Sequence, residues 1–224
     1  MFESVNVIGR GRVGTAVAAR LEERGVPLVE RDAELTLHCV PDTAIRDVSQ
    51  GQSLGHGWIA HVSGATPLSA LDPHERRFSL HPLQTLTRAR GPEQLDGAWA
   101  AITAETEEAG VRGFELAEML GLKPFELADE SRPLYHAGAA IASNYLVTLF
   151  RAAARLLDEA GAPPEALAPL MRRVIENDFE LTGPIERGDW TTVEAHLTAI
   201  RESAPDLEPM YRTLADLTAA VAAR

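Results

Sequence analysis

Three glycines near the start of the chain restrict its fold more than any other feature. An apolar run, SVNVIG, ends in Gly9, and Gly11 and Gly14 open a helical pattern, RVGTAVAARLEERG. At a junction of strand and helix, the first glycine permits a tight turn, the second lets the backbone approach a pyrophosphate, and the third lets the helix pack closely on the sheet. The helix N-terminus would then face the anion. The predicted phosphate-binding residues are Gly9, Arg10, Gly11, Arg12, Val13 and Gly14.

The two halves of the chain differ in their hydrophobic patterns. Up to residue 128, short apolar runs alternate with helical patterns, an order that implies parallel strands joined by crossover helices. Beyond residue 128 no strand candidate follows, and helices are predicted near 132–160, 164–180, 191–202 and 205–222, the second of which should start late or kink because of Pro169. We therefore expect an α/β fold class, with a truncated Rossmann-like parallel-sheet domain at 1–128 followed by an all-α helical domain at 129–224.

One strand-helix unit is missing after the first helix. The apolar runs VPLVE and LTLHCV are separated only by RDAE, whereas adjacent parallel strands need a crossover of about a dozen residues. The segment from Val26 to Glu34 should therefore not form a strand, a helix and a strand, which would leave the adenosine side of a cofactor pocket open and the affinity weak. Glu30 stands where a ribose-binding acid is expected, and Arg31 beside it suits a 2′-phosphate. The alternative is that both are solvated loop residues, so NAD and NADP both stay open.

Charge and composition exclude several classes of function. The 224 residues include 33 acidic and 21 basic ones, for a net charge of −12, and the basic residues are scattered, so nucleic acid is not an expected partner. No run of about eighteen apolar residues occurs, and the start MFESVNV lacks the pattern of an export signal, so neither a membrane span nor secretion is expected. The single cysteine, Cys39, lies in an apolar run and is expected to be a buried, inert thiol in a cytoplasmic protein.

Four ordered motifs carry a resemblance over most of the chain. They are HVSGA at 61–65, SLHPLQTL at 79–86, YHAGAAIASNYLVTL at 135–149 and LTGPIERGD at 181–189. With these motifs the sequence resembles a family that joins a Rossmann-like oxidoreductase domain to a helical domain of unknown function. More distantly, its layout is similar to ketopantoate reductase, phosphogluconate dehydrogenase and pyrroline-carboxylate reductase. This resemblance implies an NAD or NADP cofactor between the two domains and hydride transfer to or from a small acid.

The distant resemblance also implies a lysine and, four residues later, an asparagine on the first long helix of the second domain. Asn144 fits the asparagine position, but Ala140 stands where the lysine is expected, so the usual proton donor is absent. His136 shares one broad helical face with Asn144, and its imidazole could serve as acid or base instead. Ser143 lies still closer to the stripe of His136. The alternative roles are a helix-packing amide for Asn144 and a core position for His136.

Polar residues follow two predicted strands of the first domain. GWIAHVSG ends in His61, Ser63 and Gly64, and FSLHPLQT ends in His81 and Gln84. Because ligands of open parallel sheets bind beyond the carboxyl ends of the strands, these residues should converge where the nicotinamide and the substrate would lie. We favour His81 as the acid-base group over the helical histidine, because it faces this region from a strand end. Its alternative role is to hold the His-Pro turn.

The segment LTGPIERGDWTTVEAHL joins two helices through a Gly-Pro turn and a polar loop. Arg187 in this loop could pair with a substrate carboxylate or phosphate, whereas Thr191 and Glu194 form a capping box and Asp189 is an ordinary residue before a helix. No H-x-x-x-H or H-x-H pair accompanies the lone cysteine, so no metal site is expected. The further predicted cofactor-binding residues are Val40, Pro41, Ser63 and Gly64, and the predicted substrate-binding residues are Gln84 and Arg187.

Three hypotheses for the function follow. The first is an NAD(P)-dependent oxidoreductase that transfers a hydride to or from a small carboxylic acid in the interdomain cleft. The second is a non-catalytic nucleotide- or metabolite-binding protein that keeps the fold but has lost catalysis, as the missing unit and Ala140 suggest. The third is a helical dimerisation protein whose first half is a scaffold. The expected partners are a small-molecule substrate and a second copy of the chain, bound through the helical domain as a homodimer.

Overall fold

The structure, a computed structural model, describes residues 1–223 and divides into two compact units. The first unit is Met1–Ile141, and the second begins at Ala142. The helix α4 (Arg132–Ala140), which follows the predicted boundary at residue 128, therefore packs with the first unit. In the part of the chain that the structure describes, no helix is both long and apolar enough to span a lipid bilayer.

The first unit is built on a six-stranded sheet in which the strands follow one another in sequence order. Strands β1 to β4 are parallel, β5 runs antiparallel to β4, and β6 is parallel to β5. The strands are β1 (Val5–Ile8), β2 (Leu35–His38), β3 (Trp58–His61), β4 (Arg77–Pro82), β5 (Trp99–Ala104) and β6 (Lys123–Glu126).

The prediction of parallel crossovers throughout is wrong at one connection. Between β4 and β5, residues 83–98 form only a short 3-10 turn, Pro92–Leu95, in place of a crossover helix. The next strand runs antiparallel beside β4, whereas residues 62–76, which also form only a 3-10 turn, Leu68–Leu71, join β3 to β4 in parallel. The expected fold class is otherwise confirmed, because the sheet is mostly parallel, helices flank it, and a helical region follows.

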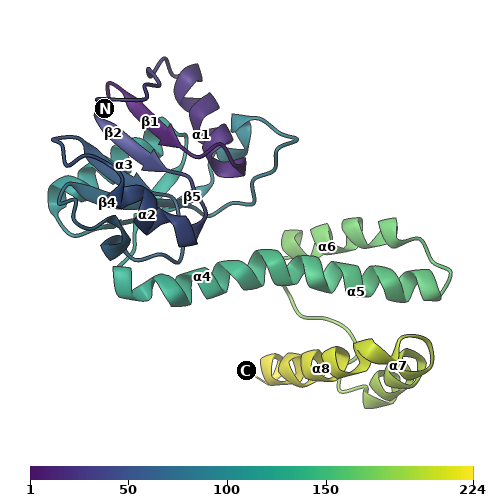
Figure 1. Ribbon diagram of the computed structural model, residues 1–224. Coiled ribbons are helices and arrows are strands. Elements are labelled where there is room, and N and C mark those ends of the chain that lie inside the picture. Colours follow the sequence, from purple (N-terminus) through teal and green to yellow (C-terminus); the bar gives the residue numbers. More distant parts are fainter. Residues whose placement is uncertain (224) are drawn as a thin grey trace. The chain divides into compact units, whose positions relative to one another are not determined.

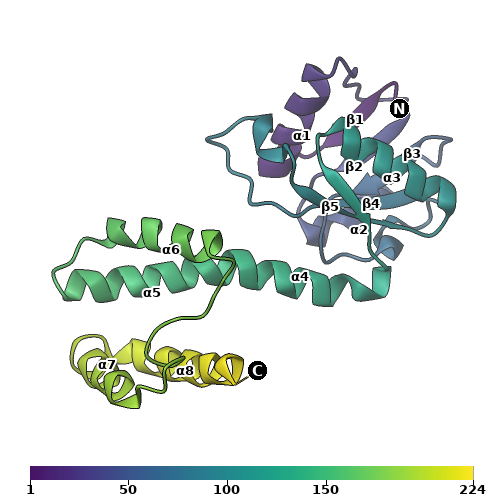
Figure 2. The same cartoon turned by 180° about the vertical axis from the view of Figure 1, so that it is seen from behind.

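Helices cover both faces of this sheet (Figures 1 and 2). On one face, α1 (Arg12–Glu23) and α3 (Glu107–Met119) cover the larger core, in which Leu21, Phe78 and Leu116 are fully buried. On the other face lie α2 (Ile45–Gln50) and a 3-10 turn, Leu68–Leu71, packed around Ile59. Each large apolar side chain buried in this way contributes about 1.5–3 kcal/mol to folding, so the alternating strand pattern fixes which face each residue occupies.

The segment after α1 has the shortened form that the sequence predicts. Its backbone pairs with β1 through an isolated bridge between Leu28 and Val5, in which the Val5 amide donates to the Pro27 carbonyl and the Val29 amide donates to the Val5 carbonyl, both at 3.0 Å. β2 pairs with the opposite edge of β1, where Val5 is in register with Leu35. The prediction that residues 26–34 form no strand, helix and strand is therefore confirmed.

The described residues of the second unit form helices and turns without a strand, as expected. A π-helical turn at Ile141–Tyr145 leads into α5 (Leu146–Glu159), and α6 (Leu167–Glu176), α7 (Trp190–Ser203) and α8 (Glu208–Ala222) follow. Pro169 lies in the first turn of α6, which starts late, as predicted, after a 3-10 turn at Pro164–Ala166.

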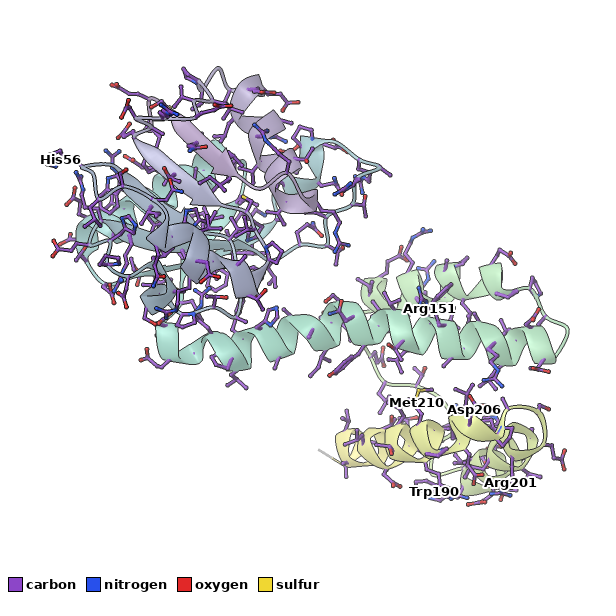
Figure 3. The ribbon with its side chains drawn as sticks, in the orientation of Figure 1. His56, Arg151, Trp190, Arg201, Asp206 and Met210 are labelled. Atoms are coloured by element: carbon purple, nitrogen blue, oxygen red, sulfur yellow. The ribbon has the colours of Figure 1, made fainter. Side chains whose placement is uncertain are left out.

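Asp189, and not the predicted capping box, closes the N-terminus of α7. Its carboxylate accepts hydrogen bonds from the Thr192 amide at 3.1 Å and from the Thr192 hydroxyl at 2.7 Å. The helix therefore begins at Trp190, two residues earlier than it would with Thr191 as the cap. Elsewhere in this unit, Arg155 of α5 pairs with Asp206, in the 3-10 turn before α8, at 2.7 Å. Asp206 is labelled in Figure 3.

Candidate active site

The glycine turn between β1 and α1 leaves almost no room for side chains at two of its positions. Gly9 has a φ of +100°, and a Cβ there would lie 2.5 Å from the carbonyl oxygen of Cys39. A Cβ on Gly14 would lie 2.0 Å from the carbonyl oxygen of Gly9. At Gly11, by contrast, a Cβ would have no neighbouring atom within 4 Å. The turn is therefore tightly packed behind and open in front.

The N-terminus of α1 is suited to an anion. Gly11 occupies the N-cap, no side chain caps the helix, and its first turn contains no acidic residue. The amides of the first turn have no partner further back in the helix, and they carry the positive end of the helix dipole. The exposed side chains of Arg10 and Arg12 flank this turn, while Val13 packs against the core. These features are what the phosphate-binding prediction requires.

The residues after β2 pack beside the glycine turn. Cys39 is buried, and burial raises the pKa of its thiol to about 12, which confirms the prediction of an inert thiol. The Cγ1 atom of Val40 would lie 3.1 Å from a Cβ on Gly9, and Pro41 is exposed next to it. The chain thus brings the predicted Val40 to the predicted glycine turn.

Two residues on the possible adenosine side are exposed. Glu30 and Arg31 follow the Leu28 bridge, and the carbonyl oxygen of Glu30 accepts a hydrogen bond from the Asn6 side chain at 3.1 Å. This bond holds the backbone of Glu30 against β1 and leaves its carboxylate in solvent.

A second group of predicted residues meets at the end of β4. The Nδ1 atom of His81 lies 2.8 Å from the hydroxyl of Tyr135, and the His81 ring stands nearly perpendicular to that of His136 with centroids 6.0 Å apart. A Cβ on Gly64 would lie 2.8 Å from both imidazole rings. Three predicted residues, Gly64, His81 and His136, are therefore in contact. Tyr135 was not predicted, although its place before His136 is a signal that could have identified it.

His81 and Tyr135 are both neutral at neutral pH. Burial, with smaller effects of His136 and of the Arg132 charge, lowers the pKa of His81 to about 4. Burial raises the pKa of Tyr135 to about 12. The Nδ1 atom of His81 shares its hydrogen bond with the Tyr135 hydroxyl. When Nδ1–H donates to that oxygen, the free lone pair of the ring is on Nε2, the atom next to Gly64, where it can accept a proton.

A row of buried polar residues crosses the sheet beside this cluster. His38, His61, Ser79 and Thr103 are register neighbours on β2 to β5, and none is more than 2% exposed. The Nδ1 atom of His61 accepts from the Ser63 amide at 3.2 Å, whereas its Nε2 and both ring nitrogens of His38 have no hydrogen-bond partner. Burial lowers the pKa of His38 to about 4 and that of His61 to about 3.

Two other predicted residues of the first unit use their polar groups locally. The Ser63 hydroxyl accepts hydrogen bonds from the amides of Ala65 and Thr66 and donates to the Thr66 hydroxyl, so it stabilises its own turn. Gln84 is exposed, and its side-chain oxygen accepts from the Thr85 amide. Their roles toward a cofactor or substrate remain predictions.

The remaining candidates belong to the second unit. Ser143 and Asn144 lie in the π-helical turn, and this turn changes the helical phase on which the comparison of Asn144 with His136 relied. Arg187 is exposed in the turn between α6 and α7, where its amide donates to the Gly183 carbonyl at 3.3 Å. The roles of these three residues also remain predictions.

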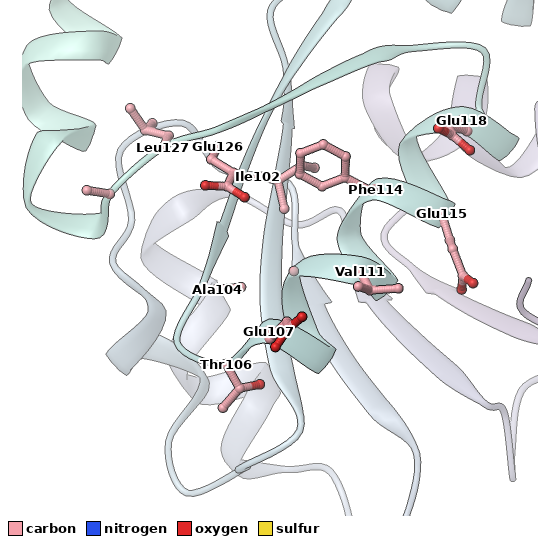
Figure 4. Close-up of a pocket in the computed structure, with 12 residues that line it drawn as sticks. Ile102, Ala104, Thr106, Glu107, Val111, Phe114, Glu115, Glu118, Glu126 and Leu127 are labelled. Atoms are coloured by element: carbon pink, nitrogen blue, oxygen red, sulfur yellow. The ribbon is translucent and has the colours of Figure 1, made fainter.

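A groove of about 710 Å³ lies on the α3 face of the sheet, opposite to the histidines (Figure 4). Its floor contains Ile102 and Phe114, and glutamates such as Glu107 and Glu126 stand at its rim. None of its lining residues belongs to the glycine turn or to the histidine cluster. Within residues 1–223, no group of three His, Cys, Asp or Glu side chains is arranged to hold a metal ion.

Solved structures with this fold bind nicotinamide cofactors in some cases. A Bacteroides fragilis protein to which NADP oxidoreductase activity has been attributed is 19% identical, with a TM-score of 0.82 over 97% of this chain and 98% of its own. The protein TM1727 from Thermotoga maritima is 24% identical, with a TM-score of 0.77 over 98% and 100% of the two chains. A reductive aminase from Aspergillus terreus, solved in complex with NADPH and ethyl levulinate, is 16% identical, with a TM-score of 0.68 over 96% and 93%.

These similarities establish a shared fold. A search of curated protein sequences finds no match to this chain. The model of a family described as a domain of unknown function, DUF2520, matches residues 98–218, which is more than half of the sequence, and the protein therefore belongs to the DUF2520 family.

Proposed function

We propose that the protein is an NAD(P)-dependent oxidoreductase that transfers a hydride to or from a small carboxylic acid, with His81 handling the proton. The observation that carries this proposal is the presence, at one edge of one sheet, of an open glycine turn and a paired histidine site. The shared fold supports it, because the Aspergillus terreus relative was solved with NADPH. The bound nicotinamide would supply or accept the hydride.

The geometry of the sheet suits a dinucleotide. Because β1 to β4 are parallel, the glycine turn after β1 and His81 in β4 lie at the same carboxyl edge. They are separated by three strand spacings, or about 14 Å, which an extended dinucleotide can bridge. The pyrophosphate would bind the amides from Gly11 onward, Val40 and Pro41 would line its path, and Ser63 and Gly64 would lie near the nicotinamide.

The protonation state of His81 indicates the reaction direction that it favours. With its pKa near 4, the ring is neutral at pH 7 and accepts a proton from a substrate hydroxyl or amine. The opposite direction needs the imidazolium form, whose population falls as the pH rises. We therefore propose that His81 serves as the base for substrate oxidation at neutral pH, and that reduction gains at lower pH.

Cofactor binding is the direct test of this function. Calorimetric titration with NADPH, NADH and ADP should show binding of at least one nicotinamide cofactor, weakly because the adenosine side lacks a regular strand. Preference for NADPH would assign Arg31 to the 2′-phosphate, and preference for NADH would assign Glu30 to the ribose. Binding of none of the three would overturn the proposal. Cofactor binding without any turnover would favour the non-catalytic binding protein instead.

As part of the proposal we place the protein in the cytoplasm, since its one cysteine can form no internal disulfide.

Substitution of Gly11 should locate the cofactor on the glycine turn. A leucine at this position would extend into the open space in front of the turn and exclude the pyrophosphate, so the affinity for NADPH should fall at least about tenfold, the equivalent of one lost hydrogen bond to a charged group. The fold should tolerate the change, because no atom crowds the new Cβ. Gly110→Leu on α3 is the matched control, since a Cβ there also meets nothing within 4 Å. Equal affinities of the two variants would remove the turn from the cofactor site.

We also propose that the second unit forms a homodimer. Its described hydrophobic cluster contains only Val193, Leu197 and Ala215, with Ile185 and Tyr211 packed against it. Several large apolar side chains on the π-helical turn, α5, α6 and the turn after α6 are more than half exposed, namely Tyr145, Val147, Leu170, Ile175 and Phe179. Exposed apolar side chains of this size favour a partner surface in water, and the occupant proposed is a second copy of the same unit.

The dimer is tested by placing a charge on this surface. Leu170 is 60% exposed, and Leu170→Glu should weaken self-association at least about tenfold, because an unpaired carboxylate would be buried in the interface. Leu54, which is 70% exposed in the first unit, provides the control variant Leu54→Glu. Analytical ultracentrifugation measures both. A monomeric wild-type protein, or equal weakening by the two variants, would contradict the proposed interface.

A further inference from the structure

Arg132, at the start of α4, is buried in the centre of the first unit. It is 1% exposed, and its guanidinium donates hydrogen bonds to the Ser79 hydroxyl at 2.6 Å and to the Thr103 hydroxyl at 2.9 Å. It also donates to the carbonyl oxygen of Ser63. Removing a charged group from water is costly unless its donors are satisfied, and these three acceptors satisfy the two terminal nitrogens, while the buried Nε has no hydrogen-bond partner.

The acceptors of Arg132 come from three separate segments. Ser79 and Thr103 are direct partners across the antiparallel β4 and β5 pair, and the Thr103 hydroxyl itself donates to the carbonyl of Leu127 at 2.8 Å. Ser63 belongs to the turn that follows β3. The planar fork of a guanidinium matches such a fixed set of acceptors, which the single ammonium of lysine does not.

A neighbouring carboxylate extends this anchor. Asp129 lies 3.7 Å from the Nε atom of Arg132 and accepts hydrogen bonds from the Leu68 amide at 3.1 and 3.3 Å. The first turn of α4 is thereby tied both to the sheet and to the 3-10 turn that follows Gly64.

Arg132 is connected to the histidine cluster through two elements, the helix α4 and the Ser63–Gly64 turn. Tyr135 and His136 come three and four residues later on α4, so they project from the same helical face as Arg132. Gly64, which contacts both imidazoles, directly follows the Ser63 carbonyl that Arg132 holds. One guanidinium thus sets the place of the helix and of the turn between which His81 lies.

We propose that Arg132 is a positioning residue of the His81 site, which holds the Ser63–Gly64 turn and the first turns of α4 so that the two imidazoles converge on Gly64. This inference rests on the proposed function, in which His81 handles the proton. In this proposal Arg132 touches neither cofactor nor substrate, but it determines the geometry and the charge around His81, which does. The Arg132 charge contributes to the low pKa of His81 and of His61, which supports this role.

Two substitutions separate the charge of Arg132 from its fork of donors. Arg132→Gln keeps an amide donor and removes the charge, whereas Arg132→Lys keeps the charge and removes the fork. The ring protons of His81, followed by NMR, should not titrate between pH 8 and 5 in the wild type. In Arg132→Gln the pKa should rise, so that the protonated fraction of His81 at pH 5 increases severalfold, while Arg132→Lys should keep the titration close to that of the wild type.

Arg20 provides the matched control for the loss of a buried arginine. It is 7% exposed, and it donates to the Pro92 carbonyl and pairs with Asp96, away from the histidines. Arg20→Gln should lower thermal stability without moving the titration of His81. If Arg132→Gln leaves the His81 titration unchanged, or if the lysine and glutamine variants raise it equally, Arg132 only anchors the fold and the inference is wrong.

Ligand affinities test the positioning of the turn itself. Arg132→Gln should weaken NADPH binding about tenfold and leave ADP binding unchanged, because ADP has no nicotinamide to contact the Ser63–Gly64 turn. Equal loss of both ligands would indicate general loosening and overturn the inference. If Arg132→Gln fails to fold, Thr103→Val removes one acceptor, keeps the charge, and should show the same split. A wild-type protein that binds no nicotinamide cofactor would instead refute the proposed function, while the titration still reports on Arg132.

Discussion

Lowering the pH from 7 to 5 is expected to reduce the folding free energy of the first unit by about 4 kcal/mol through His38 and His61 alone. His38 and His61 are fully buried, and burial lowers their pKa values to about 4 and about 3. For His61 the nearby Arg132 charge adds to the effect of burial. Neither ring can be protonated at pH 5 without unfolding or rearrangement of the sheet around it.

The sign of this effect follows from where the protons bind. In the unfolded chain both histidines titrate near their ordinary pKa of about 6.5, so below that pH the unfolded state binds protons that the native state does not. Stability is complete above pH 6.5 and is lost as the pH falls toward the folded pKa values. The pH of 5 is about 1.5 units below the unfolded pKa of each histidine, so each one lowers the folding free energy by about 2 kcal/mol. Against a total stability of about 5–15 kcal/mol, this loss should produce acid unfolding near pH 4 to 5.

His38→Leu tests this account. Neither ring nitrogen of His38 has a hydrogen-bond partner, so an apolar side chain of similar volume should leave stability at pH 7 unchanged or raise it. At pH 5 the variant should be more stable than the wild type by about 2 kcal/mol beyond any gain at pH 7, because one titrating site is gone. Urea unfolding at the two pH values measures the difference. His56, on an exposed loop in Figure 3, gives the control His56→Leu, and identical acid sensitivity of all three proteins would contradict the assignment.

The elements of the first unit could be predicted because its strands and helices differ in hydrophobic period. The direction of β5 could not, since an apolar run such as AWAAITA is the same in either direction. The absence of a helical pattern in residues 83–98 was no usable signal, because residues 62–76 also lack a crossover helix and nevertheless join parallel strands. The shortened segment before β2 was predictable from chain length alone.

The candidate site was predictable only in part. His81 and Gly64 stand at strand ends, and the rule that ligands bind beyond the carboxyl ends of strands was enough to select them. The row formed by His38, His61, Ser79 and Thr103 depends on strand register, which no local pattern encodes. Arg132 was missed for a different reason, since an arginine beside Pro133 at a helix start is ordinarily a surface residue. The guanidinium of Arg132 finds its two hydroxyl acceptors only because β5 runs antiparallel to β4, which places Thr103 next to Ser79.

Replacement of His81 by asparagine is expected to reduce turnover by about 100-fold or more while leaving cofactor affinity nearly unchanged. The amide of asparagine can still donate a hydrogen bond near Gly64 but cannot accept and release a proton at neutral pH. His136 lies next to His81, with ring centroids 6.0 Å apart, and is the nearby group that could take over the proton. Reduction is measured with a panel of small oxo acids as the loss of the absorbance of the reduced nicotinamide. Oxidation is measured with the matching hydroxy acids as the gain of that absorbance. A second histidine-tyrosine pair provides the control, since the exposed His196 contacts the Tyr211 hydroxyl through Nδ1 at 2.7 Å, and His196→Asn should leave turnover unchanged.

The pH dependence then distinguishes a proton-handling His81 from one that only packs. With a folded pKa of His81 near 4, the imidazolium fraction falls about tenfold for each pH unit above 5. The rate of reduction should therefore fall about tenfold for each unit as the pH rises from 5 to 8. Oxidation needs the neutral ring, which is already fully populated over this range, and its rate should not depend on His81 titration. In His81→Asn the slope of the reduction profile should disappear. If the variant keeps full turnover and an unchanged slope, the proton passes through His136 or water, and the role proposed for His81 is wrong.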